Sequence, residues 1–254
     1  MSETARAATP LVDTVLQPVR GHMAFESCVE QLGSAIQLGV FRAGSKLPNE
    51  RELSDRLNVS RATLREAISA LRAAGFVSTK RGRGGGTVVE SLENARPLDP
   101  ALSDPTRFDD SRGRDRQTEM NDILIFRAIV EPGACYQAAI RPVDASARLL
   151  LTTCLKEFDT VDSPAAYRQA DARLHLAIAS ACGSAELSNA CSTVQTKVHQ
   201  YLAEIPFLRT NIAGSDEQHR TIVAAILAGD GDTARLVMEK HCDATAALLK
   251  GLLK

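Results

Sequence analysis

Residues 49–76 read NERELSDRLNVSRATLREAISALRAAGF, and this stretch decides the fold of the first part of the chain. Asn49 can cap a short helix, and Glu52, three residues later, completes a capping box. Asn58 tolerates a left-handed backbone better than most residues, so we expect a sharp turn there. Ser60 is then placed to cap a second helix.

The second helix has two different faces. Leu64, Ile68 and Leu71 recur at helical spacing and predict a buried stripe. Arg61 and Arg65 lie off this stripe, at the exposed N-terminal end of the helix. Two helices joined by a tight turn, with arginines on the open face of the second, describe a helix-turn-helix.

A two-stranded wing is predicted to follow. Residues 76–80 and 87–89 have the composition of short strands, and the tip between them reads RGRGGG. Glycines at such a tip could also begin a phosphate-binding loop. No Gly-Lys-Ser/Thr follows them, so a wing is the favoured interpretation.

Charge is distributed unevenly along the 254 residues, although the net charge is only −1. Residues 42–89 contain ten Lys/Arg and four Asp/Glu, which gives +6, whereas residues 121–254 contain 13 and 15, which gives −2. A basic module attached to a mildly acidic body is typical of a protein that contacts nucleic acid on one side only.

The motif G-x-x-L-P-x-E-R-E-L-x-x-x-L-x-V-S-R-x-T-L-R-E-A begins at Gly44 and, with the basic glycine wing, resembles the N-terminal domain of GntR-family bacterial transcription regulators. The resemblance implies a homodimer that binds palindromic operator DNA. It also implies which residues contact the DNA: Arg51, Ser60, Arg61, Thr63, Arg65, Arg81, Gly82 and Arg83.

Four regions are expected along the chain. Residues 1–20 read as a flexible tail and residues 21–92 as the winged helix-turn-helix. Residues 93–118 contain three prolines and a mixed-charge run, so they are interpreted as a solvated linker. Residues 119–254 read as an all-helical domain, which the resemblance makes the effector-binding and dimerisation domain.

This second domain shows helical periodicity throughout. Caps and breakers predict helices over residues 120–139, 144–158, 163–183, 184–203, 215–229 and from 232 almost to the C-terminus. Pro132 is expected to kink the first of them. The fold class is therefore mainly α: a winged helix-turn-helix followed by an antiparallel bundle of six or seven helices.

Polar residues are sparse in the predicted bundle. Asp171 and His175 are four residues apart and share one helix face, while His219 and His241 lie on two further helices. Converging on the interior, they could bind a divalent transition metal and leave positions open for water or a ligand. On spacing alone, each histidine could equally be an ordinary core or surface residue.

The pattern D-x-x-x-H, followed by E-x-H-R-x-I-x-x-A-I-x-x-G-D-x-x-x-A-x-x-x-M-x-x-H, resembles the helical effector domain of the FadR-type branch of the same family. The resemblance implies that Asp171, His175, His219 and His241 hold Zn, Ni or Mn. It further implies that the metal helps to bind a small carboxylate effector.

Arg127 stands among apolar residues of the first bundle helix, four residues before Glu131. It is either a surface residue at the helix edge or an inward clamp for an anion, since a planar guanidinium suits a carboxylate. The family pattern places an effector-binding arginine in this helix.

The six cysteines show no CxxC spacing, and most lie in apolar helical patterns, as expected for free thiols in a reduced cytoplasmic protein. No signal peptide is evident, and no apolar run is interpreted as long enough to span a membrane.

The sequence thus predicts a ligand-responsive transcription regulator, a repressor and not an enzyme. Two alternatives remain at this point. One is a metal-dependent enzyme carrying a DNA-binding appendage, although no nucleophile or general base is evident beside the four metal-binding candidates. The other is a metal sensor, in which the metal itself is the signal.

Overall fold

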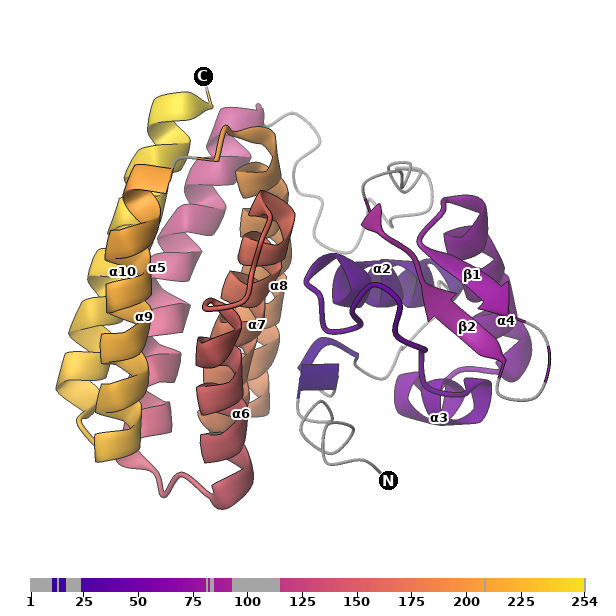
Figure 1. Ribbon diagram of the computed structural model, residues 1–254, viewed down its shortest axis with the longest axis horizontal. Helices are drawn as coiled ribbons and strands as arrows, with labels where there is room; N and C mark the ends of the chain where they lie inside the picture. The colour runs from indigo at the N-terminus through magenta and orange to yellow at the C-terminus, as the bar shows by residue number, and fades with distance from the viewer. Residues whose placement is uncertain are drawn as a thin grey trace. The chain divides into compact units, whose positions relative to one another are not determined.

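A computed structural model describes residues 11–12, 14–16, 24–80, 82, 85–92, 115–207 and 209–253, without the side chains of 209–211 and 213. The chain forms two compact units (Figure 1). One comprises Val15–Gly113, and the other comprises Met1–Thr14 together with Arg114–Lys254.

The N-terminal unit is a winged helix-turn-helix, as predicted. It contains, in chain order, α2 (Ala24–Gln37), α3 (Glu50–Leu57), α4 (Arg61–Ala73), β1 (Val77–Lys80) and β2 (Gly86–Val89). α4 packs on α2 and α3. The predicted stripe of Leu64, Ile68 and Leu71 is buried there, which fixes the opposite face of α4 toward the outside.

The caps and the turn follow the sequence signals. The side chain of Asn49 accepts a hydrogen bond from the backbone N–H of Glu52 at 2.9 Å, and Ser60 accepts one from Thr63 N–H at 3.1 Å. Asn58 has φ +52°, and it is the one described non-glycine residue in the left-handed region. The expected turn between the two helices is therefore confirmed.

The wing pairs β1 with β2 in antiparallel register, from Val77 opposite Val89 to Lys80 opposite Gly86. A third segment, which the sequence did not reveal, lies on the other side of β2. Gly44 N–H donates to Val89 O at 2.8 Å, and Leu47 N–H donates to Thr87 O at 2.9 Å. The segment before α3 is thereby tied to the wing.

The second unit is an antiparallel helical bundle, also as predicted. Its described helices are α5 (Arg116–Ile140), α6 (Ala145–Glu157), α7 (Pro164–Ala181), α8 (Ala185–Glu204), α9 (Arg209–Ala228) and α10 (Gly231–Leu252). α5 lies at the centre of the packing, since it contacts α7, α8, α9 and α10 (Figure 1). This arrangement brings residues from α5, α7, α9 and α10 toward one interior.

Several boundaries differ from the expectation. α5 begins at Arg116, inside the predicted linker, because Asp115 caps it through Thr118 N–H. α9 begins at Arg209, upstream of the expected Ser215 cap. Asp230, two residues before the expected start, caps α10 by accepting from Thr233 N–H. Pro132 lies within α5 without ending it.

One further finding corrects the sequence interpretation. Within the expected tail, the described residues Leu11, Val12, Val15 and Leu16 are buried. α5 is also long and apolar enough to cross a membrane by length and composition, but half of its most apolar window is buried in the bundle. That burial is what a core helix requires.

Candidate metal centre and DNA-binding surface

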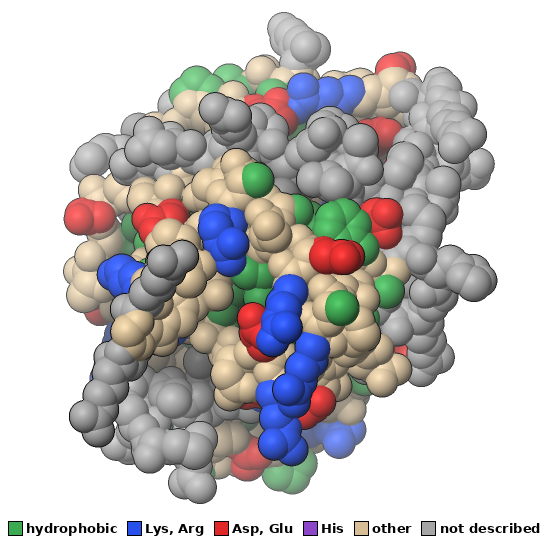
Figure 2. Space-filling view, turned by 90° about the vertical axis from the view of Figure 1, so that its right-hand side faces the viewer, with side chains coloured by type: hydrophobic (Ala, Val, Ile, Leu, Met, Phe, Trp, Pro, Cys, Tyr) green, Lys and Arg blue, Asp and Glu red, His purple; other side chains and the backbone are tan. Residues whose placement is uncertain are grey.

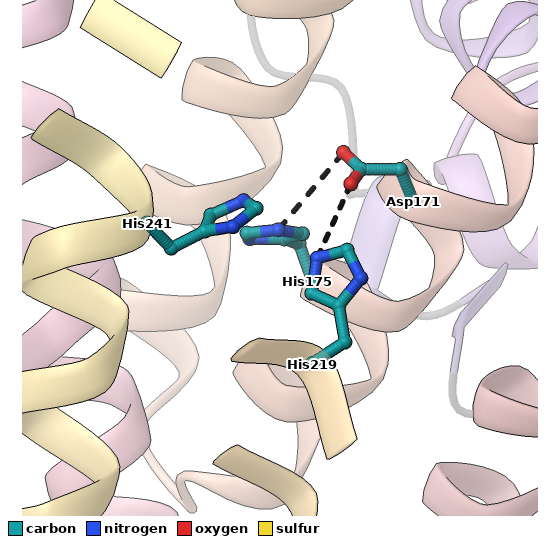
Figure 3. A group of neighbouring side chains, drawn as sticks. All are labelled: Asp171, His175, His219 and His241. Atoms are coloured by element: carbon teal, nitrogen blue, oxygen red, sulfur yellow. Dashed lines mark ion pairs between the residues drawn. The ribbon is translucent and has the colours of Figure 1, made fainter. Parts of the chain in front are cut away.

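Asp171, His175, His219 and His241 converge in the bundle interior. One ligand atom from each lies within 4.8 Å of the others, and the three histidines are buried. Figure 3 shows the four side chains turned toward one another. Asp171 Oδ1 lies 3.3 Å from His219 Nε2, and Asp171 Oδ2 lies 4.0 Å from His175 Nε2.

Buried ring nitrogens are left without partners in this cluster. Among the described residues, neither nitrogen of His175 or of His219 has a well-aligned hydrogen bond. An orphaned buried polar atom costs about 1–3 kcal/mol, so ring nitrogens in this state favour a bound ligand that would use them. Three imidazoles and one carboxylate fit a divalent ion such as zinc or nickel, so the donors are consistent with a metal site.

The pKa values of the residues in this cluster are shifted from their ordinary values. Burial raises the pKa of Asp171, but the close contact with His219 and the neighbouring histidine charges outweigh this, and the net pKa is lowered. Burial lowers the pKa of His175, yet Glu131 and Asp171 raise it overall. Burial and the other two histidines push the pKa of His241 well below its ordinary value, which favours the neutral, ligating form.

A second set of contacts orients the rings. His241 Nδ1 lies 3.2 Å from Gln218 Oε1, a contact that selects the tautomer with Nε2 free. Phe158 lies against the His219 ring, with centroids 4.9 Å apart. Fixed rings of this kind preorganise a site for its ligand.

Arg127 points inward and is 1% exposed, so the surface alternative is excluded. Its Nε donates to Glu131 Oε2 at 2.8 Å, and its buried Nη1 has no partner among the described residues. The same Glu131 oxygen lies 3.1 Å from His175 Nδ1. The arginine and the metal-binding candidates are thus neighbours, joined by one carboxylate.

Glu131 is the main residue that the sequence interpretation missed. It also accepts a hydrogen bond from Gln195 Nε2, on α8. Burial raises the pKa of Glu131, but the charges of Arg127 and His175 outweigh it and the pKa is lowered, so the group is ionised. Its spacing four residues after Arg127 was a usable signal for a pair, whereas Gln195 gave none.

On the N-terminal unit, three predicted arginines are exposed. Arg61 lies at the first turn of α4, with no ion pair to an acid among the described residues. Arg65 Nε donates to Glu50 Oε2 at 2.7 Å, and Arg51 Nε lies 3.8 Å from Asp55. Figure 2, which looks onto this unit, shows Lys and Arg side chains gathered in a row with acidic ones beside them.

Ser60 and Thr63 occupy the start of the same helix. Their hydroxyls lie 2.8 Å apart, so the cap holds both at the exposed end of α4. Gly82, at the wing tip, has φ +104°, which a larger side chain rarely adopts. Arg81 and Arg83 lie outside the described residues.

A winged helix-turn-helix joined to a helical bundle with a buried polar site is the architecture of a ligand-controlled DNA-binding protein. Comparison with known families agrees: "Bacterial regulatory proteins, gntR family" matches residues 26–89, and "FCD domain" matches residues 122–244. The chain therefore belongs to the GntR family of bacterial transcription regulators, with an FCD domain as its C-terminal part.

Individual proteins show the same likeness. The "Putative L-lactate dehydrogenase operon regulatory protein" of Escherichia coli (strain K12) is 31% identical over 210 residues, covering 78% of this chain and 76% of that protein. The HTH-type transcriptional regulator LutR of Bacillus subtilis (strain 168) is 27% identical over 225 residues, covering 85% and 96%. In fold, E. coli McbR/YncC matches with a TM-score of 0.51 at 15% identity, covering 91% and 99%.

These relatives are regulators and not enzymes, so the alternative of a metal-dependent enzyme falls away.

Proposed function

We propose that this regulator is a repressor whose bundle binds a divalent metal, zinc, nickel or manganese, and a small carboxylate effector. One observation carries the proposal. One carboxylate and three buried histidines bring ligand atoms within 4.8 Å of one another with unpartnered ring nitrogens, next to the unpartnered Nη1 of Arg127. Metal and anion would each satisfy polar atoms that are otherwise costly to bury.

Asp171, His175, His219 and His241 would hold the metal. When bound, a divalent ion of this kind supplies a Lewis-acid position that attracts an anionic oxygen. Arg127 would hold the effector carboxylate through Nη1, because its Nε is already occupied by Glu131. Binding at both points would fix the orientation of a small acid.

The N-terminal unit would read a palindromic operator. α4 would enter the major groove, with Arg51, Ser60, Arg61, Thr63 and Arg65 contacting bases or phosphates. The wing would add Arg81, Gly82 and Arg83. In a homodimer, two such units would reach half-sites roughly 34–36 Å apart or a multiple of that spacing.

The bundle offers a surface for a homodimer. Ile125, Phe126 and Ile129 on α5 are 63%, 42% and 68% exposed, and they form an apolar strip on this helix. The protein would act in the cytoplasm, where operator DNA is found. The effector would change DNA affinity by binding one dimer arrangement better than another.

The test begins with operator selection from random DNA, followed by fluorescence anisotropy with metal, with chelator and with a panel of carboxylates. We expect sequence-specific binding that a carboxylate releases only when metal is present. Release by metal without any organic acid would identify a metal sensor instead. No effect of either would overturn the proposed receptor role of the bundle.

A further inference from the structure

Glu131 stands where the two halves of the proposed receptor site meet. It is 3% exposed and contacts Arg127 at 2.8 Å, His175 Nδ1 at 3.1 Å and Cys242 Sγ at 3.5 Å. It therefore contacts both one of the metal-binding candidates, His175, and the proposed anion clamp, Arg127. It is not one of the four proposed metal ligands, so metal ligation by itself assigns it no role.

Charges that are buried together must nearly balance, since an unpaired charge in a low-dielectric interior is costly. In the metal-bound state the ligating histidines are neutral. Arg127 then contributes +1, and Glu131 and Asp171 contribute −1 each, so the protein groups sum to −1 before the ion is counted. A divalent ion raises this to +1. One negative charge then remains to be supplied by a ligand.

Charges nearer the surface do not alter this balance. Arg168 is half-buried, and Asp216 accepts a hydrogen bond from Tyr167 at 2.7 Å. They carry opposite charges and are partly screened by solvent. The net charge inside the bundle is therefore determined by the buried groups.

We propose that Glu131 determines the charge of the effector, so that the metal-loaded bundle accepts monoanionic carboxylates and discriminates against dicarboxylates. This inference rests on the proposed function. Glu131 acts as a specificity residue through Arg127 and through the local potential, without touching the metal. Without its charge, the loaded cluster would carry +2 and would favour a dianion.

The test compares two ligands of equal size on the full-length, metal-saturated protein by calorimetry. L-malate carries two carboxylates, and its 4-monoamide replaces one of them with a neutral amide. We expect the wild-type protein to bind the monoamide at least about tenfold more tightly, because opposite or like charges a few ångströms apart differ by more than this in a protein interior.

Glu131→Gln keeps the shape and the hydrogen bond to Arg127 but removes the charge. We expect it to shift the malate-to-monoamide affinity ratio at least about tenfold toward malate. Glu131→Asp, which keeps the charge, should retain the wild-type preference. Glu157→Gln is the matched control, because Glu157 on α6 forms a comparable ion pair with Arg173 on α7 at 2.6 Å. The malate-to-monoamide affinity ratio of this variant should equal that of the wild-type protein.

Metal affinity is measured separately, by competition with a chromophoric chelator, because a change in the partner of His175 can weaken metal binding about 10–100-fold. If Glu131→Gln does not fold, the affinities of the wild-type protein for malate and for its monoamide still test the inference, because they need no variant.

Each outcome decides the inference. A wild-type preference for malate, or an unchanged ratio in folded, metal-loaded Glu131→Gln, would overturn it while leaving the proposed receptor intact. Binding of metal but of neither acid by the wild-type protein would refute the proposed carboxylate effector itself, and this inference with it.

Discussion

Each of the two units of this protein contains an Arg–Glu ion pair, and the two pairs have nearly equal N–O distances. Arg65 and Glu50 meet at 2.7 Å on the N-terminal unit, where their side chains are 65% and 43% exposed. Arg127 and Glu131 meet at 2.8 Å in the bundle, where they are 1% and 3% exposed. The two ion pairs have similar distances, but one is exposed to water and the other is buried, so they contribute differently to stability and binding.

The exposed pair leaves its arginine available. Water screens both charges, so such a pair contributes only about 0–1 kcal/mol, and a phosphate or a base can replace the glutamate at little cost. The buried pair cannot be exchanged in this way, because removing either partner strands the other charge in the interior. The exposed pair suits reversible contact with DNA, whereas the buried pair suits the proposed small ligand, whose charge would complete the charge balance inside the bundle.

The largest expected effect tests this contrast directly. Glu131→Ala should lower the free energy of unfolding of the bundle by about 3–5 kcal/mol, because Arg127 loses its buried partner. Urea unfolding followed by tyrosine fluorescence measures it, since the chain has no Trp and its Tyr136, Tyr167 and Tyr201 all lie in the bundle. Glu50→Ala, in the exposed pair, should lower the free energy of unfolding of the N-terminal unit by less than about 1 kcal/mol, as followed by far-UV circular dichroism. Equal losses in the two variants would contradict the comparison.

Metal removal comes next. At metal concentrations about 100 times the dissociation constant, binding should stabilise the bundle by about 2.7 kcal/mol, and a chelator should remove this stabilisation. His219→Ala should abolish the difference between the two conditions, because the ring lies 3.3 Å from Asp171 at the centre of the cluster. A variant that still gains the full stabilisation would show that the ion binds elsewhere.

On the exposed side, Arg61→Ala should weaken operator binding by about 1–3 kcal/mol without changing the unfolding of either unit. Anisotropy of a labelled operator at fixed salt measures the loss. Arg220→Ala is the control, because this arginine is also exposed but lies on α9 in the bundle, 3.5 Å from Glu217. Unchanged affinity for the Arg61 variant would refute its assignment to the DNA interface.

The smallest effect concerns the turn between α3 and α4. Asn58→Ala should destabilise the N-terminal unit by about 1 kcal/mol, because alanine fits poorly at φ +52°. Asn58→Gly should be close to neutral, since glycine adopts this conformation freely. Amide hydrogen exchange in α4 distinguishes the two, and similar protection in both variants would show that backbone conformation is unimportant here.

The sequence by itself determined the local structure. Asn49, Asn58 and Ser60 specified the helix caps and the turn because those signals act over three or four residues. The periodic apolar positions specified the bundle, and the motif from Gly44 indicated the family. The sequence located helix ends less well, because several polar residues near each boundary could serve as the cap. The structure shows that Asp115 and Asp230 are the caps of α5 and α10.

Only the tertiary structure decided what lies inside. Residues 171, 175, 219 and 241 are separated by up to 70 positions, and no local rule states that their donors meet. The inward direction of Arg127, and the role of Glu131 between it and His175, depended on four helices packing around α5. Burial sets the energetic weight of a charge, and burial is a property of the packed molecule and not of the sequence around that charge.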